Sequence, residues 1–305
     1  MISQSQHNDP CDDYPFVAAG RYRTARRAHE AGLAVMAAGH SYWIHEDEDY
    51  FVLLVDRRHA DILRREVQIA DIKNRYWPPP SVDLPTKTTS KIPTVLFGLF
   101  LVVVFTAQGR FPFLREIGMN SSIGVMENGE FWRIITAITL HADLGHLAGN
   151  LMGIGLFTYL CARYLGNGFA WLLIIVVSAA SNLTNAVVQS GLPYFSLGAS
   201  TAVFAALGLL TGFPVGIYLK SREPLQTRDW LVPFSGGCLL FAWMGGGDFP
   251  TDVAAHSWSF VYGSAASAIV AFLSLHAKMS PVVQKGMLLG AWVVIGGSWI
   301  LALLA

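Results

Sequence analysis

Apolar runs separated by short polar loops fill the last two thirds of the chain. The runs cover residues 92–107, 146–165, 169–190, 198–219, 230–246, 253–276 and 286–304. Each run is close to the ~20 residues with which an α-helix crosses ~30 Å of hydrocarbon. The pattern therefore predicts seven membrane-spanning helices, numbered here as spans 1 to 7 in chain order.

In the segment before the first span, apolar and polar residues alternate with the spacing of soluble helices and strands. Residues 21–40 have helical spacing, residues 41–55 alternate as two strands around an acidic turn, and residues 56–74 form a charged amphipathic helix. A hairpin between two helices can bury a modest core of its own. The pattern predicts a small α/β domain.

A proline-rich stretch, residues 77–93, separates this domain from the first span and predicts a boundary. We predict a soluble cytoplasmic N-terminal domain with its linker over residues 1–85 and a membrane domain over residues 86–305. The N-terminal domain shows no catalytic constellation, so we expect a regulatory or docking module.

Composition narrows the class of protein. The 305 residues are 53% hydrophobic and 14% charged, whereas a soluble domain carries about 25% charged residues. The net charge is zero, so nothing indicates nucleic acid. Three cysteines without CxxC or Cys/His spacing predict neither disulfides nor zinc, and we expect no metal or cofactor. The N-terminus lacks the pattern of a signal peptide.

Lysine and arginine predict the orientation. With the N-terminus inside, the inner flanks and loops hold Lys87, Lys91, Arg163, Lys220, Arg222, Arg228, Lys278 and Lys285. The outer side holds Arg110, Arg115 and Arg133, all in the long first loop. This bias obeys the positive-inside rule, so we expect the N-terminus in the cytoplasm and the C-terminus outside. Residues 129–144, which contain Trp132, are expected to lie in the outer interface.

Polar residues inside a bilayer are costly, and each is a functional hypothesis. Ser200 opens span 4, followed by Phe204 and by glycines at every fourth position. The glycines are Gly208, Gly212 and Gly216. Such a stripe first predicts close helix packing, with chemistry only at its outer end.

His256 lies near the outer start of span 6, on a helix with a second stripe of small residues, Ser259, Gly263 and Ser267. At 1.5 Å per residue, Ser200 lies roughly 3 Å into span 4 and His256 roughly 5 Å into span 6. Two close-packed parallel helices would then bring the hydroxyl to the imidazole, which can accept its proton. Phe204 is placed to pack on the ring. Asp252 either orients the imidazole or is a solvated loop acid.

A third cluster is "HADLGHLAGN", residues 141–150. His146 and Asn150 share one helical face and can both donate hydrogen bonds to a developing oxyanion. His141 and His146 are five residues apart, which does not favour a metal pair on one helix. His141 is expected to serve the loop or the helix start.

These motifs resemble the rhomboid family of intramembrane serine proteases between about residues 129 and 263. The resemblance lies in the Trp-Arg of the first loop, the histidine/asparagine motif of span 2, "GAS" followed by "TAVFAALG", and "AHSWSFVYG". It implies an all-α polytopic protein with a rhomboid-like six-helix core and an added seventh helix. The soluble α/β domain precedes this core.

By position, the resemblance implies a Ser-His dyad of Ser200 and His256. It implies an oxyanion hole of His146, Asn150 and the backbone N–H of Ser200. Gly198 matches the family glycine before the serine. Phe204 stands where the family has an aromatic residue that packs on the histidine.

The sequence departs from the family at three places. Thr201 and Ser259 stand where the family has glycine, and Ala162 stands near a frequent glutamate. Thr201 narrows the space beside the serine, but no catalytic group is missing.

The resemblance implies a serine endopeptidase that cleaves transmembrane segments of other proteins through an acyl-enzyme. We expect a multi-pass protein of a bacterial inner membrane. Two alternatives stay open: a catalytically silent rhomboid-like protein that binds membrane segments, and a small proton-coupled transporter. The substrate and the oligomeric state are not predicted.

Overall fold

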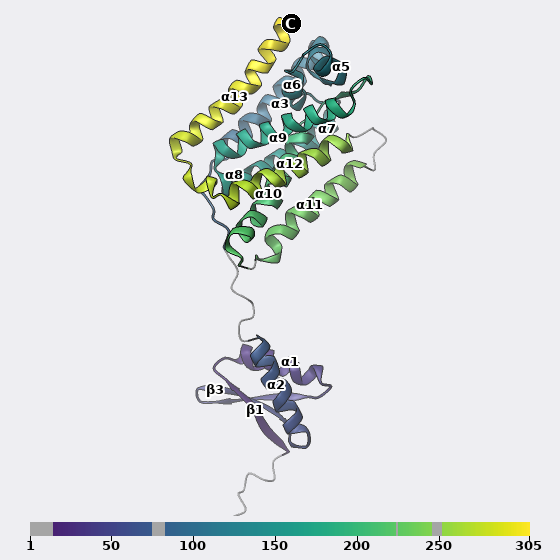
Figure 1. Ribbon diagram of the computed structural model, residues 1–305. Helices are drawn as coiled ribbons and strands as arrows, with labels where there is room; N and C mark the ends of the chain where they lie inside the picture. Colours follow the sequence, from purple (N-terminus) through teal and green to yellow (C-terminus); the bar gives the residue numbers. More distant parts are fainter. Residues whose placement is uncertain (1–14, 75–82, 224, 246–251) are drawn as a thin grey trace, which may run out of the picture. The chain divides into compact units, whose positions relative to one another are not determined.

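The computed structural model describes residues 15–74, 83–223, 225–245 and 252–305. The chain divides into two compact units, Met1–Pro80 and Ser81–Ala305, each described by itself (Figure 1).

The first unit packs two helices against a three-stranded antiparallel sheet of order β1-β3-β2. Its elements are β1 (Phe16–Tyr22), α1 (Ala25–Ala37), β2 (Tyr42–Asp47), β3 (Tyr50–Asp56), a 3-10 turn (Arg57–His59) and α2 (Ala60–Asn74). Buried Val35, Leu53 and Leu63 show that α1, β3 and α2 share one core.

Strand β1 is absent from the sequence-based prediction, which began this unit with a helix at residue 21. The structure places residues 16–22 in a strand, and α1 begins only at Ala25. The reason is local: the side chain of Thr24 accepts a hydrogen bond from the backbone N–H of Arg27 and caps the helix there. Because alanine and glycine weaken its alternation, the strand FVAAGRY is hard to recognise.

The second unit is almost entirely helical. Its long elements are α3 (Ile92–Arg110), α7 (Leu144–Gly153), a π-helical turn (Ile154–Thr158), α8 (Tyr159–Leu165), α9 (Asn167–Val188), α10 (Ser200–Ser221), α11 (Thr227–Gly245), α12 (Val253–Phe272) and α13 (Pro281–Leu304). Helix α7, the π turn and α8 together form the predicted span 2. A 3-10 turn, Leu275–Lys278, links α12 to α13.

Among the described residues, five helical segments are long and apolar enough to cross a membrane. They are Ile92–Arg110, Leu144–Leu165, Asn167–Val188, Ser200–Ser221 and Pro281–Leu304. The protein is therefore a polytopic α-helical membrane protein. The predicted spans 5 and 6 correspond to α11 and α12, which are helices but are not among the five. Seven spans, as a six-helix core with an added seventh, stay a prediction.

The long first loop is folded. It contains α4 (Phe113–Gly118), β4 (Asn120–Ser121), α5 (Ser122–Met126), α6 (Arg133–Thr136) and a 3-10 turn (Ala137–Thr139). Strand β4 pairs with β5 (Phe195–Ser196), which leads into α10. The guanidinium of Arg133 donates to Glu130 and to the backbone oxygens of Glu116 and Met119, which holds the loop together.

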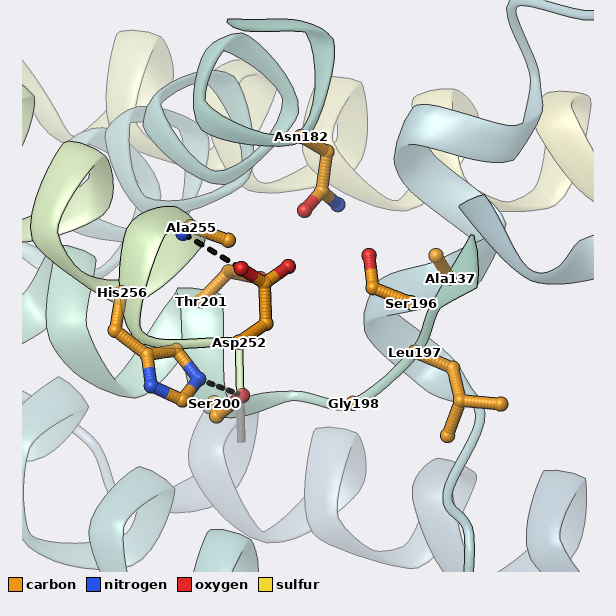
Figure 2. A pocket seen from close by; sticks show the side chains of 10 residues that line it. All are labelled: Ala137, Asn182, Ser196, Leu197, Gly198, Ser200, Thr201, Asp252, Ala255 and His256. Atoms are coloured by element: carbon orange, nitrogen blue, oxygen red, sulfur yellow. Dashed lines mark hydrogen bonds between the residues drawn. The ribbon is translucent and has the colours of Figure 1, made fainter. Parts of the chain in front are cut away.

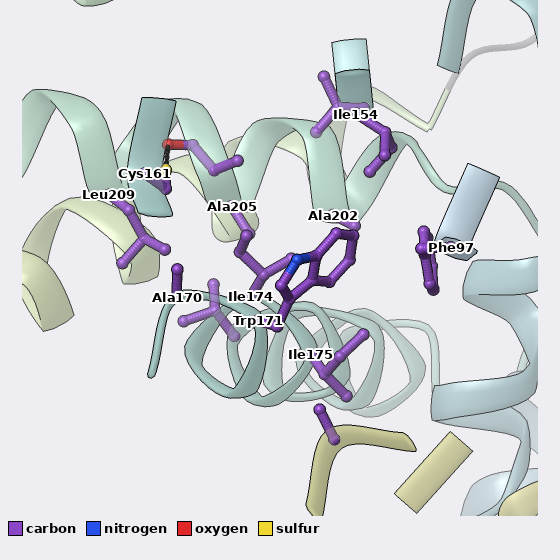
Figure 3. Close-up of a cluster of buried hydrophobic side chains, with 14 of the residues drawn as sticks. Phe97, Ile154, Cys161, Ala170, Trp171, Ile174, Ile175, Ala202, Ala205 and Leu209 are labelled. Carbon is purple, nitrogen blue, oxygen red and sulfur yellow. Dashed lines mark hydrogen bonds between the residues drawn. The ribbon is translucent and has the colours of Figure 1, made fainter. Parts of the chain in front are cut away.

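Helix α10 lies at the centre of the unit. Of an apolar 18-residue stretch of this helix, 72% is buried inside the protein, whereas the corresponding share for α13 is 17%. Figure 3 shows Trp171 of α9 among Ala202 and Ala205 of α10 and Phe97 of α3. The buried core thus surrounds the helix that begins at Ser200.

Helices α10 and α12 touch through their main chains. A Cβ added at Gly208 would lie 2.3 Å from the carbonyl oxygen of Phe260, and one at Gly212 would lie 1.9 Å from that of Ser264. On the facing helix, a Cβ at Gly263 would lie 2.5 Å from the carbonyl oxygen of Ala205. The predicted stripes of small residues on α10 and α12 therefore face each other and form this contact. Larger side chains at these positions would separate the helices.

Candidate active site

The turn that delivers Ser200 requires glycine. Gly198 has φ of +137°, and its N–H donates to the carbonyl of Ala137 at 2.9 Å. A Cβ at Gly198 would lie 2.7 Å from the Cε1 and Nε2 atoms of His146. The backbone conformation and the close approach of the imidazole both exclude a larger residue. Ser200 then begins α10 and is only 5% exposed.

Ser200 and His256 meet across the α10–α12 contact. Ser200 Oγ and His256 Nε2 are 2.7 Å apart, and the histidine is 3% exposed (Figure 2). The ring of Phe204 stacks on the imidazole, with ring centroids 4.6 Å apart and an interplanar angle of 19°. The imidazole is thus held between an aromatic face and the serine hydroxyl.

His146 and Asn150 both lie on α7, and the ring of His146 reaches the site. The carboxylate of Asp143 accepts a hydrogen bond from the backbone N–H of His146 at 2.8 Å, which caps the helix. The His146 ring lies against Gly198, two residues before the serine. Asn150 is 4% exposed, and its amide nitrogen has no hydrogen-bond partner among the described residues. A buried amide without an acceptor is suited to a ligand that supplies one.

His141 is fully buried and supports the start of α10. Its Nε2 accepts a long hydrogen bond, 3.5 Å, from the N–H of Ala199, and the side chain of Gln108 bonds its backbone. Its ring meets that of His146 edge to face at 5.3 Å. Burial lowers the pKa of His141 to about 3, so it is neutral at pH 7 and able to accept.

Asp252 is the N-cap of α12. One oxygen accepts from the N–H of Ala255 at 3.0 Å, and the other accepts from Asn185 Nδ2 at 2.7 Å and from the hydroxyl of Tyr194. Burial raises the pKa of this carboxyl, while the bonds from Ala255 and Asn185 oppose the rise. These bonds involve both oxygens, and none of them runs to the imidazole of His256.

Asn185 and Tyr194 were not predicted as site residues. The available signal was Asn185 itself, a fully buried amide in the apolar span α9, where an unpaired polar group is costly. Tyr194 lies in an irregular loop, so the pattern of apolar residues gives no indication that it bonds Asp252.

A small cavity lies beside Ser200 and His256, with space for about one water molecule. Its lining residues are Ala137, Asn182, Ser196, Leu197, Gly198, Ser200, Thr201, Asp252, Ala255 and His256 (Figure 2). Thr201 therefore shapes the space next to Ser200, as the sequence predicted. Within the described ranges, no group of three or more His, Cys, Asp or Glu is placed to hold a metal ion.

Part of the chain resembles known proteins. Residues 128–273 match the model of the Rhomboid domain, and this range contains all the site residues described above except Gln108. The putative rhomboid protease YdcA of Bacillus subtilis (strain 168) is 40% identical over 95 residues, which are 31% of this chain and 47% of that protein. The rhomboid protease GluP of the same strain is 33% identical over 110 residues, 32% of this chain and 21% of that protein.

The matched segments span less than half the length of either relative. Both relatives are named as rhomboid proteases, which agrees with the match to the Rhomboid domain, and the polytopic helical fold is compatible with that match. The chain therefore carries a rhomboid domain at residues 128–273.

Proposed function

We propose that this protein is an intramembrane serine endopeptidase that cleaves transmembrane segments of other membrane proteins. The observation that carries the proposal is the 2.7 Å contact between Ser200 Oγ and His256 Nε2 in a buried site. A serine hydroxyl is a weak nucleophile until a neighbouring base takes its proton. The names of the two relatives, both rhomboid proteases, support the same reaction class.

In this mechanism Ser200 Oγ attacks the carbonyl carbon of the scissile peptide bond. His256 Nε2 takes the hydroxyl proton, which requires the tautomer whose proton is on Nδ1. Collapse of the tetrahedral intermediate breaks the C–N bond, and His256 returns the proton to the leaving amine. Water, deprotonated by His256, then hydrolyses the acyl-enzyme and regenerates Ser200.

The oxyanion of each tetrahedral intermediate needs donors. We assign these to His146, the amide of Asn150 and the backbone N–H of Ser200, at the N-terminus of α10. The unpartnered amide of Asn150 and the contact of His146 with the Gly198 turn support this assignment. One such donor contributes about 3 kcal/mol to the stability of a transition state.

Burial of the site favours a substrate that comes from the bilayer. Ser200 and His256 are at most 5% exposed, and the neighbouring cavity has space for about one water molecule. A peptide segment must therefore be extended and narrow at the cleaved bond, so a helical substrate has to unwind there. We place the protein in a bacterial inner membrane with its N-terminal domain in the cytoplasm.

The test is cleavage of a model transmembrane substrate by purified protein in detergent, together with labelling by a fluorophosphonate. Wild type should cleave and label, whereas Ser200→Ala and His256→Ala should lose both. Ser257→Ala is the control, because Ser257 adjoins the histidine but bonds the carbonyl of Val253.

Labelling of Ser200→Ala at the wild-type rate would place the nucleophile elsewhere. Binding of the substrate by wild type without cleavage or labelling would instead indicate a silent rhomboid. Proton-coupled uptake in vesicles that persists in both alanine variants would indicate a transporter.

A further inference from the structure

Three segments meet at the carboxylate of Asp252. It caps the first turn of α12 through the N–H of Ala255, the residue before His256. It also accepts from Asn185, in the third predicted span α9, and from Tyr194, in the loop that leads to Ser200. Asn185 Nδ2 also donates to the hydroxyl of Tyr194, which closes the network.

Tyr194 is fixed on its other side by the first loop. The N–H of Ser122 donates to the carbonyl of Tyr194 at 3.2 Å, and the N–H of Tyr194 donates to Ser122 Oγ at 3.2 Å. The next two residues pair with β4. The segment from Tyr194 to Ser200 is thus held between the first loop and the start of α12.

We propose that Asp252, Asn185 and Tyr194 form a polar clamp that sets the distance between Ser200 and His256, with Asp252 as a positioning residue. This inference rests on the proposed function for its catalytic consequence. The clamp joins the two chain segments that carry the dyad, six residues before the serine and four residues before the histidine. It acts from the outer end, whereas the glycine contacts of α10 and α12 begin farther along both helices.

The chemistry of the clamp requires an ionised carboxylate. Three donors converge on two oxygens, and a carboxylate is the side chain that accepts all of them without donating. Hydrogen bonds to a charged group are about twice as strong as neutral ones. Asn185 is fully buried, so loss of the carboxylate would leave its amide with the Tyr194 hydroxyl in place of two acceptors at the junction of α9 and α12.

Two substitutions separate the clamp from the helix cap. Asp252→Ser keeps an oxygen that can cap α12, since serine is as good an N-cap as aspartate, but it is too short to reach Asn185 and Tyr194. Tyr194→Phe removes only the hydroxyl. We expect Asp252→Ser to lower kcat for a transmembrane substrate about 10- to 100-fold, and Tyr194→Phe about 5- to 10-fold. KM should change less than about twofold, and the two effects should not add in the double variant.

Tyr262→Phe is the matched control. The Tyr262 hydroxyl bonds Thr184 Oγ1 at 3.0 Å, so it also joins α9 and α12, but Tyr262 lies six residues beyond His256. A general loss of contact between these helices would lower kcat in Tyr262→Phe as much as in Tyr194→Phe. The clamp predicts wild-type kcat in Tyr262→Phe.

Hydrogen exchange in a Ser200→Ala background tests the clamp without catalysis. Asp252→Ser and Tyr194→Phe should speed exchange of the amides of residues 255–258 about tenfold, and Tyr262→Phe should not. Wild-type exchange and wild-type kcat in Tyr194→Phe would overturn the clamp while leaving the protease proposal intact. Absence of cleavage in wild type, with faster exchange in both clamp variants, would overturn the protease proposal and support the clamp.

Discussion

Thr201 stands directly after the candidate nucleophile, where the family resemblance leads one to expect glycine. Its side chain is 5% exposed, and its hydroxyl has no hydrogen-bond partner among the described residues. It also lines the small cavity beside Ser200. A buried hydroxyl without a partner among the described residues is costly for folding.

Thr201→Val should therefore stabilise the protein. Valine keeps the shape of threonine and removes the unpaired hydroxyl, so we expect a gain of about 1–3 kcal/mol in the free energy of unfolding. The measurement is unfolding in mixed detergent and SDS. Thr211→Val is the control, because the Thr211 hydroxyl already donates to the carbonyl of Leu207 and its removal should bring no gain. A less stable Thr201→Val would show that the hydroxyl has a partner.

Asn150 should matter for catalysis and not for stability. If its free amide stabilises the oxyanion, Asn150→Ala lowers kcat about 10²- to 10³-fold with little change in KM. The unfolding free energy should stay equal or rise, since the amide has no partner among the described residues. In the control Asn182→Ala, the lost amide donates to the carbonyl of Ile134, and stability should fall. A loss of stability in Asn150→Ala equal to that of the control would contradict the oxyanion role.

At the scale of residues, the sequence was informative where a polar side chain stands in an apolar run. Burying such a side chain in a membrane costs free energy, so it usually has a function. This argument singled out Ser200, His256, His146 and Asn150. The similar depths of Ser200 and His256 followed from the helical rise. The partners of Asp252 did not follow, because Tyr194 reaches it from an irregular loop and hydrogen bonds between loops leave no period in a sequence.

Among the elements, the α10–α12 pair depends on small residues. Gly212→Val should destabilise the protein by about 3 kcal/mol, because its side chain would meet the carbonyl of Ser264 and force the helices apart. The dyad should separate with them, so fluorophosphonate labelling should slow in parallel. Gly290→Val is the control: a Cβ there meets nothing within 4 Å, and we expect a change within about 0.5 kcal/mol. Equal effects of the two substitutions would contradict the packing role of the stripe.

The positions of helices could be predicted where a run of apolar residues indicates them. The long helices of the membrane unit lie where the apolar runs predicted them. The π-helical turn at Ile154–Thr158 was not predicted, since a single wide turn leaves an apolar run unchanged. The folded first loop was predicted only as an interfacial segment, because its short helices depend on bonds such as those of Arg133.

For the molecule as a whole, the seven-span prediction puts the two termini on opposite sides of the membrane. Alkaline phosphatase fused after Ala305 should be active in a bacterial host, and green fluorescent protein fused there should be dark. Fusion after Arg222, in a predicted inner loop, should give the reverse and serves as the control. Fluorescence at the C-terminus would mean an even number of spans and would remove either α11, α12 or α13 from the membrane count.

Charge and proline content change near residue 80, close to the division between the two units at Pro80 and Ser81. Their cores share no residue: one contains Leu53 and Leu63, and the other contains Trp171 and Phe213.

The uneven burial of the helices has a consequence for how the protein meets membranes of different thickness. Over an apolar stretch of 18 residues, α13 is 17% buried and α3 is 28% buried, whereas α10 is 72% buried. A thicker or thinner bilayer acts first on helices that touch lipid, and such helices adapt by tilting. Helix α10 is shielded by its neighbours and locked to α12 through main-chain contact. When the lipid chain length changes, α3 and α13 should therefore change their tilt, while the geometry around Ser200 stays constant.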